Sequence, residues 1–594
     1  MLERFLRRHR LIVGLFILAL AIAARLTYFV QADGSPIMAL HRWSQSDMSY
    51  FHGWARQIAA GDLLSRHVGP PLHHWQLEIA QQFLHEHQDE ARALLPAGFN
   101  LTAPDALDST PLRDAATALW NRWSGEHRLY QDPLYPYLVA LTFTLAGEDV
   151  RWVFAWQLAL GALAVLLVWL IARRCFGETV GAVSGLIAAL YGPMLFYDMI
   201  LLRETPITSA GLLIVWLWMR AIERPVPLRW LLTGSALGAG VLLKSQFLLL
   251  LVAVIGLLAI NGRLPARQRL VLAGLLVAGA LALLSPLIAR NLAVGVGPLA
   301  PASSGAANFI LANAEDAGAV DLGTGHVAEI LERTRGATGP TMILAWRTHR
   351  SLRSLALLFW ARFATIWHWV EVPNNENFYF YGLHAPVLRW MPFTFATVGP
   401  LGLLGMALAL RRRDRAGPLY ALVLVSLASI TLFFPFSRLR LPMAVAMIPF
   451  AALSVVQMLR WLAERRWVAA GLSLAGIVVL GTWTWRPVPS SLPLIRMADH
   501  GTAFNIFYLP QIQGALQRND LATAARVLGD ALRRQADQLA TPDTIRRPLN
   551  QEEKQIARTY AGLYARQAEL LRHLGRADEA AAAKRRAVLL NIPP

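Results

Sequence analysis

Long apolar runs without a charged residue constrain this chain more than any other feature. The stretches 11–23, 271–289 and 467–485 contain no Asp, Glu, Lys or Arg. A helix of about 20 apolar residues spans the ~30 Å hydrocarbon core of a bilayer. The composition agrees, because 55% of the residues are hydrophobic and 16% are charged, against about 45–50% and about 25% in soluble domains. The sequence therefore predicts an all-α polytopic membrane protein.

The basic residues predict how the chain is threaded. The net charge is +18, and the arginines gather at the ends of apolar runs, as expected for loops that stay on the cytoplasmic side. This clustering argues against a nucleic-acid partner. The basic start of the chain leads into an apolar run without a small-residue cleavage site, so we expect an uncleaved first span with its N-terminus inside. The later basic clusters are Arg173/Arg174, Arg220/Arg224/Arg229, Arg263/Arg267/Arg269, Arg411–Arg413/Arg415 and Arg460/Arg465/Arg466.

About eleven transmembrane helices satisfy this pattern, and an odd number places the C-terminal segment outside. The segment 354–370 is apolar, but counting it as a span would move Arg411–Arg413 to the outer side. It also contains Arg362 and His368, so we expect an interfacial helix on the outer surface. The predicted spans are 10–30, 152–172, 178–197, 205–221, 229–243, 245–261, 269–288, 392–410, 418–435, 441–459 and 467–485.

Two outer loops and the tail are too long to be simple connections. The loops, about 31–150 and 290–390, are expected to carry helices, because loops beyond ~12–15 residues usually have a function. We place a boundary between a membrane domain, 1–486, and a charged helical tail, 487–594. The tail repeats small residues at the spacing of tetratricopeptide helices, at Ala524/Ala531 and Ala580/Ala587. An ordinary helical bundle is the alternative.

The chain lacks the sequence signatures of nucleotide-driven chemistry. There is no GxxxxGK[ST], no GxGxxG after a strand and no Asp-x-Asp, which argues against an ATP-driven pump and against a soluble nucleotide-sugar transferase. The single cysteine, Cys175, excludes an intramolecular disulfide and a multi-cysteine metal site. An enzyme at the outer face would need a donor activated in another way, such as a lipid phosphate.

Ionisable residues from five outer connections are predicted to meet at the outer membrane boundary. Such groups are costly near a membrane and are usually functional. They are Asp47, Asp198, Arg203, Glu204, Lys244, Arg290, Glu371, Arg438 and Arg440.

Each of these residues also has a structural interpretation. Asp47 could be a helix N-cap, Arg203 and Glu204 a local ion pair, and Lys244 a snorkelling side chain. Arg438 and Arg440 could anchor the interface. The histidines of the first outer loop are expected to be solvated, because they lack metal-ligand spacing.

Several short motifs, taken in order, resemble a known superfamily. They are Asp47-x-x-Tyr50, Ile58-Ala59-Ala60-Gly61-Asp62, Pro133-Leu134-Tyr135-Pro136-Tyr137, Arg173-Arg174-Cys175-Phe176-Gly177, Tyr197-Asp198 to Glu204, Pro286-x-x-x-Arg290-Asn291 and Arg438-Leu439-Arg440-Leu441-Pro442. Over about residues 10–460 the chain is similar to the GT-C polytopic glycosyltransferases. These enzymes use lipid-phosphate-linked sugars, and the similar branch includes the protein O-mannosyltransferases and lipid A aminoarabinose transferases. The chain departs from the pattern of this superfamily in two ways. It has an insertion at about 69–121, and Asp47 lacks an acidic neighbour, which argues against a protein as the acceptor.

The resemblance implies that the first-loop acid, Asp47, is catalytic. A carboxylate in hydrogen-bond reach of an acceptor proton can act as a general base, and cations stabilise the charge on a leaving phosphate. The candidate donor-phosphate ligands are Lys244, Arg290, Arg438 and Arg440. The candidates that orient the acceptor or hold a divalent metal ion are Asp198, Glu204, Glu371 and Tyr50. Inversion at the sugar carbon is expected, because no second nucleophile is evident.

The sequence thus predicts a bacterial inner-membrane glycosyltransferase with a periplasmic active site. It would move a sugar from a polyprenyl-phosphate donor to an acceptor lipid, glycan or protein, and the tail could recruit a periplasmic protein partner. A divalent metal ion is the one cofactor left open. The alternatives are a transporter or flippase for a lipid-linked sugar and a non-catalytic envelope assembly protein that acts through its helical tail. The sugar, the carrier lipid and the oligomeric state stay open.

Overall fold

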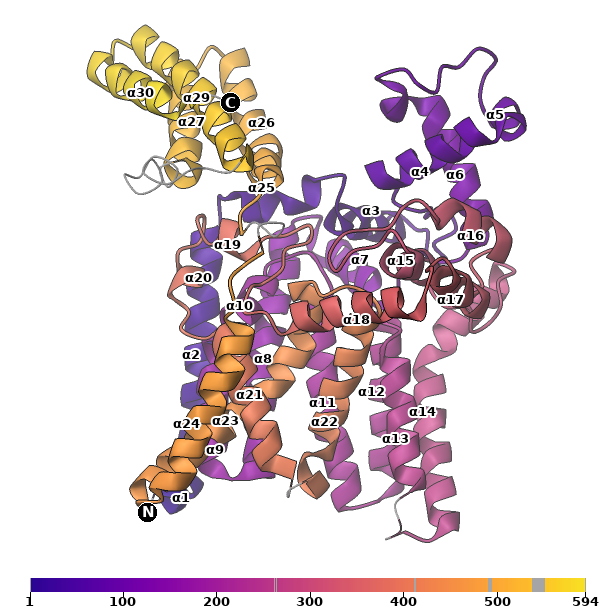
Figure 1. Cartoon of the computed structure of the whole chain (residues 1–594), viewed down its shortest axis with the longest axis vertical. Helices are drawn as coiled ribbons and strands as arrows, with labels where there is room; N and C mark the ends of the chain where they lie inside the picture. Colours follow the sequence, from indigo (N-terminus) through magenta and orange to yellow (C-terminus); the bar gives the residue numbers. More distant parts are fainter. Residues whose placement is uncertain are drawn as a thin grey trace. The chain divides into compact units, whose positions relative to one another are not determined.

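The computed structural model describes residues 2–260, 262, 264–410, 413–489, 494–536 and 551–592. The ordered elements in these residues are helices (Figure 1), and the only extended pairing described is an isolated bridge between Tyr191 and Phe393. The predicted all-α polytopic fold is confirmed. Arg263, Arg411 and Arg412, which the topology argument used, lie outside the described residues.

Seven of the described helices are long and apolar enough to cross a membrane. They are α2 (Arg10–Ala32), α8 (Val150–Phe176), α11 (Glu204–Glu223), α14 (Ala266–Ala293), α22 (Arg413–Leu432), α23 (Ser437–Ala463) and α24 (Trp467–Thr484). Shorter apolar helices are α7 (Leu134–Ala146), α9 (Glu178–Ala189), α12 (Pro227–Leu243), α13 (Phe247–Ala259) and α21 (Phe395–Ala409).

The predicted spans all fall on these helices, and one of them is interrupted. The span 178–197 ends as a regular helix at Ala189, and the chain resumes as α10 (Gly192–Tyr197), with Pro193 in its first turn. Proline does not continue the preceding helix, because it has no backbone N–H to donate and its ring clashes with the carbonyl group four residues earlier. The count of eleven spans stays a prediction. The location of α18 (Leu352–Ile366) on the membrane surface is also still a prediction.

The chain divides into two compact units, and each unit contains segments that are far apart in the sequence. Unit 1 comprises Met1–Arg25, Ser44–Val370 and Pro392–Arg486, and unit 2 comprises Leu26–Trp43, Glu371–Met391 and Pro487–Pro594. The tail predicted at 487–594 therefore folds together with two segments outside that range.

Unit 1 holds the apolar helices, apart from the end of α2 beyond Arg25, and most of the two long loops. The loop helices are α3 (Asp47–Ala59), α4 (His74–Glu86), α5 (Gln88–Leu94), α6 (Thr110–Ser124), α15 (Ser304–Asn313), α16 (Val327–Thr334), α17 (Thr338–Arg347) and α18. Of the long apolar helices, α23 is the most deeply enclosed, with 89% of its apolar window buried. Its first turn contributes to the candidate site described below.

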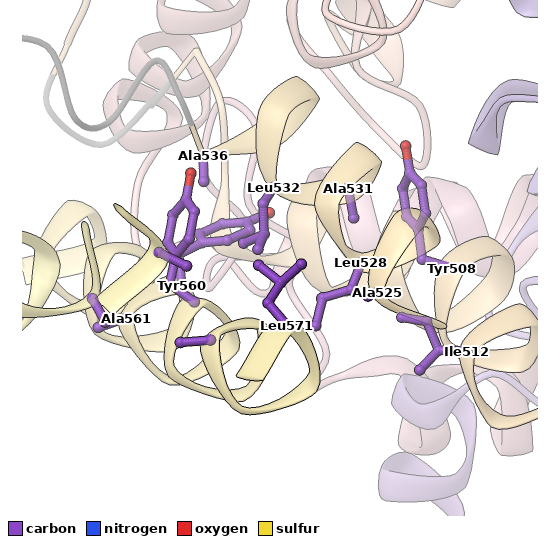
Figure 2. Close-up of a cluster of buried hydrophobic side chains, with 14 of the residues drawn as sticks. Tyr508, Ile512, Ala525, Leu528, Ala531, Leu532, Ala536, Tyr560, Ala561 and Leu571 are labelled. Carbon is purple, nitrogen blue, oxygen red and sulfur yellow. The ribbon is translucent and has the colours of Figure 1, made fainter. Parts of the chain in front are cut away.

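Unit 2 is a helical unit with its own apolar core. The tail helices are α25 (Met497–Ala503), α26 (Leu509–Gln517), α27 (Leu521–Gln535), α29 (Gln551–His573) and α30 (Ala577–Leu590). Figure 2 shows part of the core, with Leu528, Leu532 and Leu571 between the helices. The small residues Ala524, Ala531, Ala580 and Ala587 are buried in this core. The tetratricopeptide class of the tail stays a prediction.

Candidate functional site

Asp47 opens helix α3 but does not cap it. The N-cap is Ser46, whose hydroxyl accepts a hydrogen bond from the backbone N–H of Ser49 at 3.2 Å. Asp47 is the first residue of the helix itself. The capping interpretation of Asp47 is therefore wrong, because the neighbouring serine satisfies that role.

An ion pair joins Asp47 to the start of α23. The Nη1 atom of Arg438 lies 2.7 Å from Oδ2 of Asp47, and the two side chains are 15% and 18% exposed. Burial alone would raise the pKa of the Asp47 carboxyl, but Arg438, His73 and Arg203 outweigh it and hold that pKa below its usual value. Asp47 is thus an ionised, partly buried carboxylate at neutral pH.

Two further side chains adjoin Asp47. His73 is 8% exposed, and its ring interacts electrostatically with the Asp47 carboxylate. Burial lowers the pKa of His73, while Asp47 acts in the opposite direction, so the ring is neutral at pH 7. Tyr50 lies one turn along α3, and its ring meets that of Tyr130 edge-on at 5.6 Å. The expectation that the loop histidines are solvated is wrong for His73.

A second polar cluster surrounds Arg203. Its guanidinium donates to Oδ2 of Asp132 at 3.1 Å and to Oε1 of Gln131 at 2.7 Å. Asp132 also accepts hydrogen bonds from the backbone N–H and the hydroxyl of Ser245. Sequence reasoning missed Asp132, although it immediately precedes the Pro133-Leu134-Tyr135 motif. The cluster fixes the turn between α12 and α13.

Lys244 occupies this turn, immediately after α12. Among the described residues, no carboxylate lies within ion-pair distance of its ammonium group. Burial and the nearby Arg203 lower the pKa of Lys244 to about 7, although Glu204 acts in the opposite direction. Glu204 is 5% exposed and begins α11, and its Oε2 atom has no hydrogen-bond partner among the described residues.

Two of the predicted phosphate ligands, Arg290 and Arg440, donate hydrogen bonds to backbone carbonyl groups instead. Arg290 donates to the carbonyl oxygens of Leu64, Ser65 and His127 at 2.7–3.2 Å. Arg440 donates to the carbonyl oxygens of residues 366, 368 and 370 at 2.6–2.9 Å. These guanidinium groups hold loops in place, so the structure argues against their assignment to a phosphate.

Two of the residues predicted to orient the acceptor or hold a metal ion, Asp198 and Glu371, are buried. Asp198 is fully buried and forms an ion pair with Arg25 of α2 at 2.8 Å. It also accepts a hydrogen bond from the Thr205 hydroxyl at 2.8 Å. Glu371 belongs to unit 2, where it is 2% exposed. In the part of the chain that the structure describes, no three His, Cys, Asp or Glu side chains gather in a way that could hold a metal ion.

The comparisons with known proteins cover part of the chain. Residues 131–289 match the family model of dolichyl-phosphate-mannose-protein mannosyltransferases. The chain is 28% identical over 217 residues to the lipopolysaccharide core galacturonosyltransferase RgtA of Rhizobium johnstonii. That match covers 36% of this chain and 43% of the relative, so it spans less than half of the relative's length.

Two solved structures of the Archaeoglobus fulgidus oligosaccharyltransferase show a weak likeness. The apo form is 14% identical with a TM-score of 0.32, over 60% of this chain and 48% of that one. The form tethered to an acceptor peptide with the NVT sequon is 13% identical with a TM-score of 0.34, over 62% and 50%.

Proposed function

We propose that the chain is a glycosyltransferase of the GT-C superfamily that moves a sugar from a polyprenyl-phosphate donor to an acceptor; the matches to the mannosyltransferase family model and to the galacturonosyltransferase support this. The reaction takes place on the periplasmic side of the bacterial inner membrane. The observation that carries the proposal is the ionised Asp47 carboxylate, held by Arg438 beside the turn of Lys244.

In the proposed reaction Asp47 is the general base. The acceptor hydroxyl or amine attacks the anomeric carbon of the sugar, and its proton passes to a carboxylate oxygen of Asp47. The bond from the anomeric carbon to the phosphate oxygen breaks, and its electron pair stays on the leaving polyprenyl phosphate. Attack from the face opposite the phosphate inverts the configuration.

The charge of Asp47 suits this role. A carboxylate with a lowered pKa is a weak base, but it is fully ionised at neutral pH. As the new bond to the anomeric carbon forms, the acceptor proton becomes acidic, so a weak base can remove it. Arg438 keeps the carboxylate ionised and oriented until then.

The leaving phosphate requires cations, and the partners of the four predicted ones guide our choice among them. Arg290 and Arg440 are held by carbonyl oxygens, whereas Arg438 and Lys244 adjoin the Asp47 region. Arginine can bind two phosphate oxygens at once, and lysine acts as a point charge. We assign donor-phosphate binding to Arg438 and Lys244, and orientation of the acceptor to Glu204 and Tyr50.

The test is sugar transfer by the purified protein in detergent or nanodiscs. Radiolabelled polyprenyl-phosphate sugars serve as donors, and wild type is compared with Asp47→Ala and Asp47→Asn. Loss of a general base costs about 10²–10⁴-fold in rate. The matched control is Asp89→Asn, because the Asp89 side chain is 98% exposed and also comes from the first outer loop.

The outcomes separate the proposal from its alternatives. Transfer or donor hydrolysis by wild type and Asp89→Asn, lost in both Asp47 variants, supports the proposal. Full turnover by Asp47→Ala refutes the catalytic assignment. If wild type consumes no donor in the panel, the glycosyl-transfer proposal fails, and a lipid-flipping assay then tests the transporter alternative.

A further inference from the structure

A small hollow lies along the side of α3 that carries Tyr50. Its volume is about 280 Å³, slightly below the ~300–1,000 Å³ of pockets for drug-sized ligands. Helix α3 supplies Ser49, Tyr50, Gly53, Trp54 and Gln57, and the stretch 68–71 also lines it. That stretch leads into the insertion at 69–121, which distinguishes this chain from the superfamily pattern.

The lining of the hollow carries no charge. Its polar groups are the hydroxyls of Ser44 and Ser49 and the amide of Gln57. Its apolar surface comes from aromatic rings and prolines, including Tyr50 and Pro70. A pyranose ring offers complementary chemistry, because its C–H face packs on aromatic and proline surfaces while its hydroxyls exchange hydrogen bonds with neutral polar groups.

A glycine of α3 leaves this hollow open for a ligand. Gly53 lies inside the helix, where glycine costs about 0.5–1 kcal/mol relative to alanine. A Cβ atom at Gly53 would meet no other atom within 4 Å, so the space above it is empty.

The lining of the hollow selects against acidic sugars. Asp47 lies three residues before Tyr50, so both side chains project from one face of the helix. The Asp47 carboxylate is paired with Arg438, as described above, and no Lys or Arg lines the hollow. The carboxylate of a uronic acid would therefore lose hydration without gaining a cation partner in the lining.

We propose that this hollow binds an uncharged pyranose ring beside Asp47, and that Gly53 determines its specificity by keeping the space free. The inference rests on the proposed function. The ring could belong to the sugar carried by the donor or to a sugar of a glycan acceptor. Both sources offer the same chemistry, and the kinetics distinguish them.

The test uses the full-length protein and the variant Gly53→Leu, which fills the hollow. The control is Ala59→Leu, because Ala59 is exposed on the same helix and lies outside the hollow. Methyl α-glucopyranoside and methyl α-galactopyranoside serve as soluble inhibitors of transfer, beside glucuronate and galacturonate. Thermal unfolding of both variants checks that they fold.

We expect the two neutral glycosides to inhibit wild type and Ala59→Leu, and the two uronates to inhibit much less. In Gly53→Leu the inhibition constant of the glycosides should rise about tenfold or more, equal to ~1.4 kcal/mol. Competition against the donor identifies the transferred sugar as the occupant, and competition against the acceptor identifies an acceptor sugar.

Other results overturn the inference while leaving the proposed function intact. They are equal inhibition by uronates and glycosides, or unchanged inhibition in a folded Gly53→Leu protein that still transfers sugar. If wild type transfers no sugar, the proposed function fails instead. Ligand-observed NMR of the two glycosides with wild type and Gly53→Leu then tests the hollow by itself, and equal binding to both proteins refutes it.

Discussion

At the scale of single residues, the cations at the ends of the spans differ in what they bind. Arg290 and Arg440 donate to backbone carbonyl oxygens, whereas Arg438 binds a carboxylate. Lys244 adjoins Arg203 and Glu204 without an ion pair among the described residues. The first two therefore stabilise loops, and the last two remain candidates for the donor phosphate.

The pH dependence of donor binding tests the role of Lys244. Its pKa is lowered to about 7, first by burial and then by Arg203. The ammonium is charged below pH 7 and loses its proton as the pH rises, so the KM for the donor should increase above about pH 7. Lys244→Arg should stay charged and keep a flat KM up to pH 9, because the pKa of arginine exceeds 12.

Lys244→Met provides the complementary control. It should show a high KM for the donor at every pH. A wild-type KM that does not change between pH 6 and pH 9 would contradict the assignment. The same shift also affects stability, because folding releases a proton from Lys244 between about pH 7 and its ordinary pKa of 10.5. The contribution of this residue to stability therefore becomes more favourable as the pH rises through that window.

Arg290→Gln should reduce stability more than donor binding. Its guanidinium holds the carbonyl oxygens of Leu64, Ser65 and His127. Each hydrogen bond to a charged group contributes ~1.5–3 kcal/mol, so the free energy of unfolding should fall by at least that amount. Thermal unfolding in detergent and donor KM are the two measurements. A raised donor KM at an unchanged melting temperature would instead place Arg290 at the phosphate.

At the scale of elements, glycines set how closely α12 and α14 approach. A Cβ atom at Gly279 of α14 would lie 2.2 Å from the carbonyl oxygen of Leu231 in α12. At Gly234 of α12 it would lie 2.0 Å from the carbonyl oxygen of Leu276. Small residues allow helix backbones to pack closely inside membranes. Helix α12 comes directly before the Lys244 turn, and α14 comes after α13 in the chain.

Gly279→Ala should therefore separate α12 from α14. Overpacking of this kind costs about 1–3 kcal/mol, which a thermal unfolding experiment in detergent can detect. Gly274→Ala is the matched control on the same helix, because a Cβ atom there meets nothing within 4 Å. The control should be neutral or slightly stabilising. Equal melting temperatures for the two variants would disprove the close packing.

At the scale of the whole molecule, the spans could be predicted because they depend on local sequence. Apolar length and flanking arginines are properties of each segment, and the predicted spans fall on helices. The break at Pro193 was missed, although proline itself signals it.

The side-chain partners could not be predicted in the same way. Arg290 and Arg438 both lie at the ends of apolar runs, and the difference between their partners arises from loops more than a hundred residues distant in sequence. Asp47 and Arg438 are 391 residues apart along the chain. The place of His73 beside Asp47 depends on the folding of the first outer loop, which no local pattern encodes.

Unit 2 is also built from segments that are far apart in the sequence. Asn377 is fully buried, and its amide donates to Asp499 at 2.7 Å and to the carbonyl oxygen of Leu494 at 2.8 Å. Its side-chain oxygen accepts hydrogen bonds from the backbone N–H groups of Tyr379 and Phe380. This residue therefore ties the segment 371–391 to the start of the tail.

Asn377→Ala should loosen the tail in the full-length protein. The buried Asp499 and the nearby backbone groups would lose partners, at a cost of ~1–3 kcal/mol. Hydrogen exchange of 494–536 should become faster, and limited proteolysis should cut this stretch sooner. Gln511→Ala, at an exposed position of α26, should leave both unchanged. Identical exchange in the two variants would show that Asn377 does not hold the tail.

The most direct test of the central claim is the rescue of Asp47→Ala by formate in a single-turnover transfer assay. If the Asp47 carboxylate accepts the acceptor proton, the variant should lose about 10²–10⁴-fold in rate. Added formate should then restore part of that rate, while Asp89→Asn should show wild-type transfer without it. A single-turnover rate of Asp47→Ala equal to that of wild type would contradict the account.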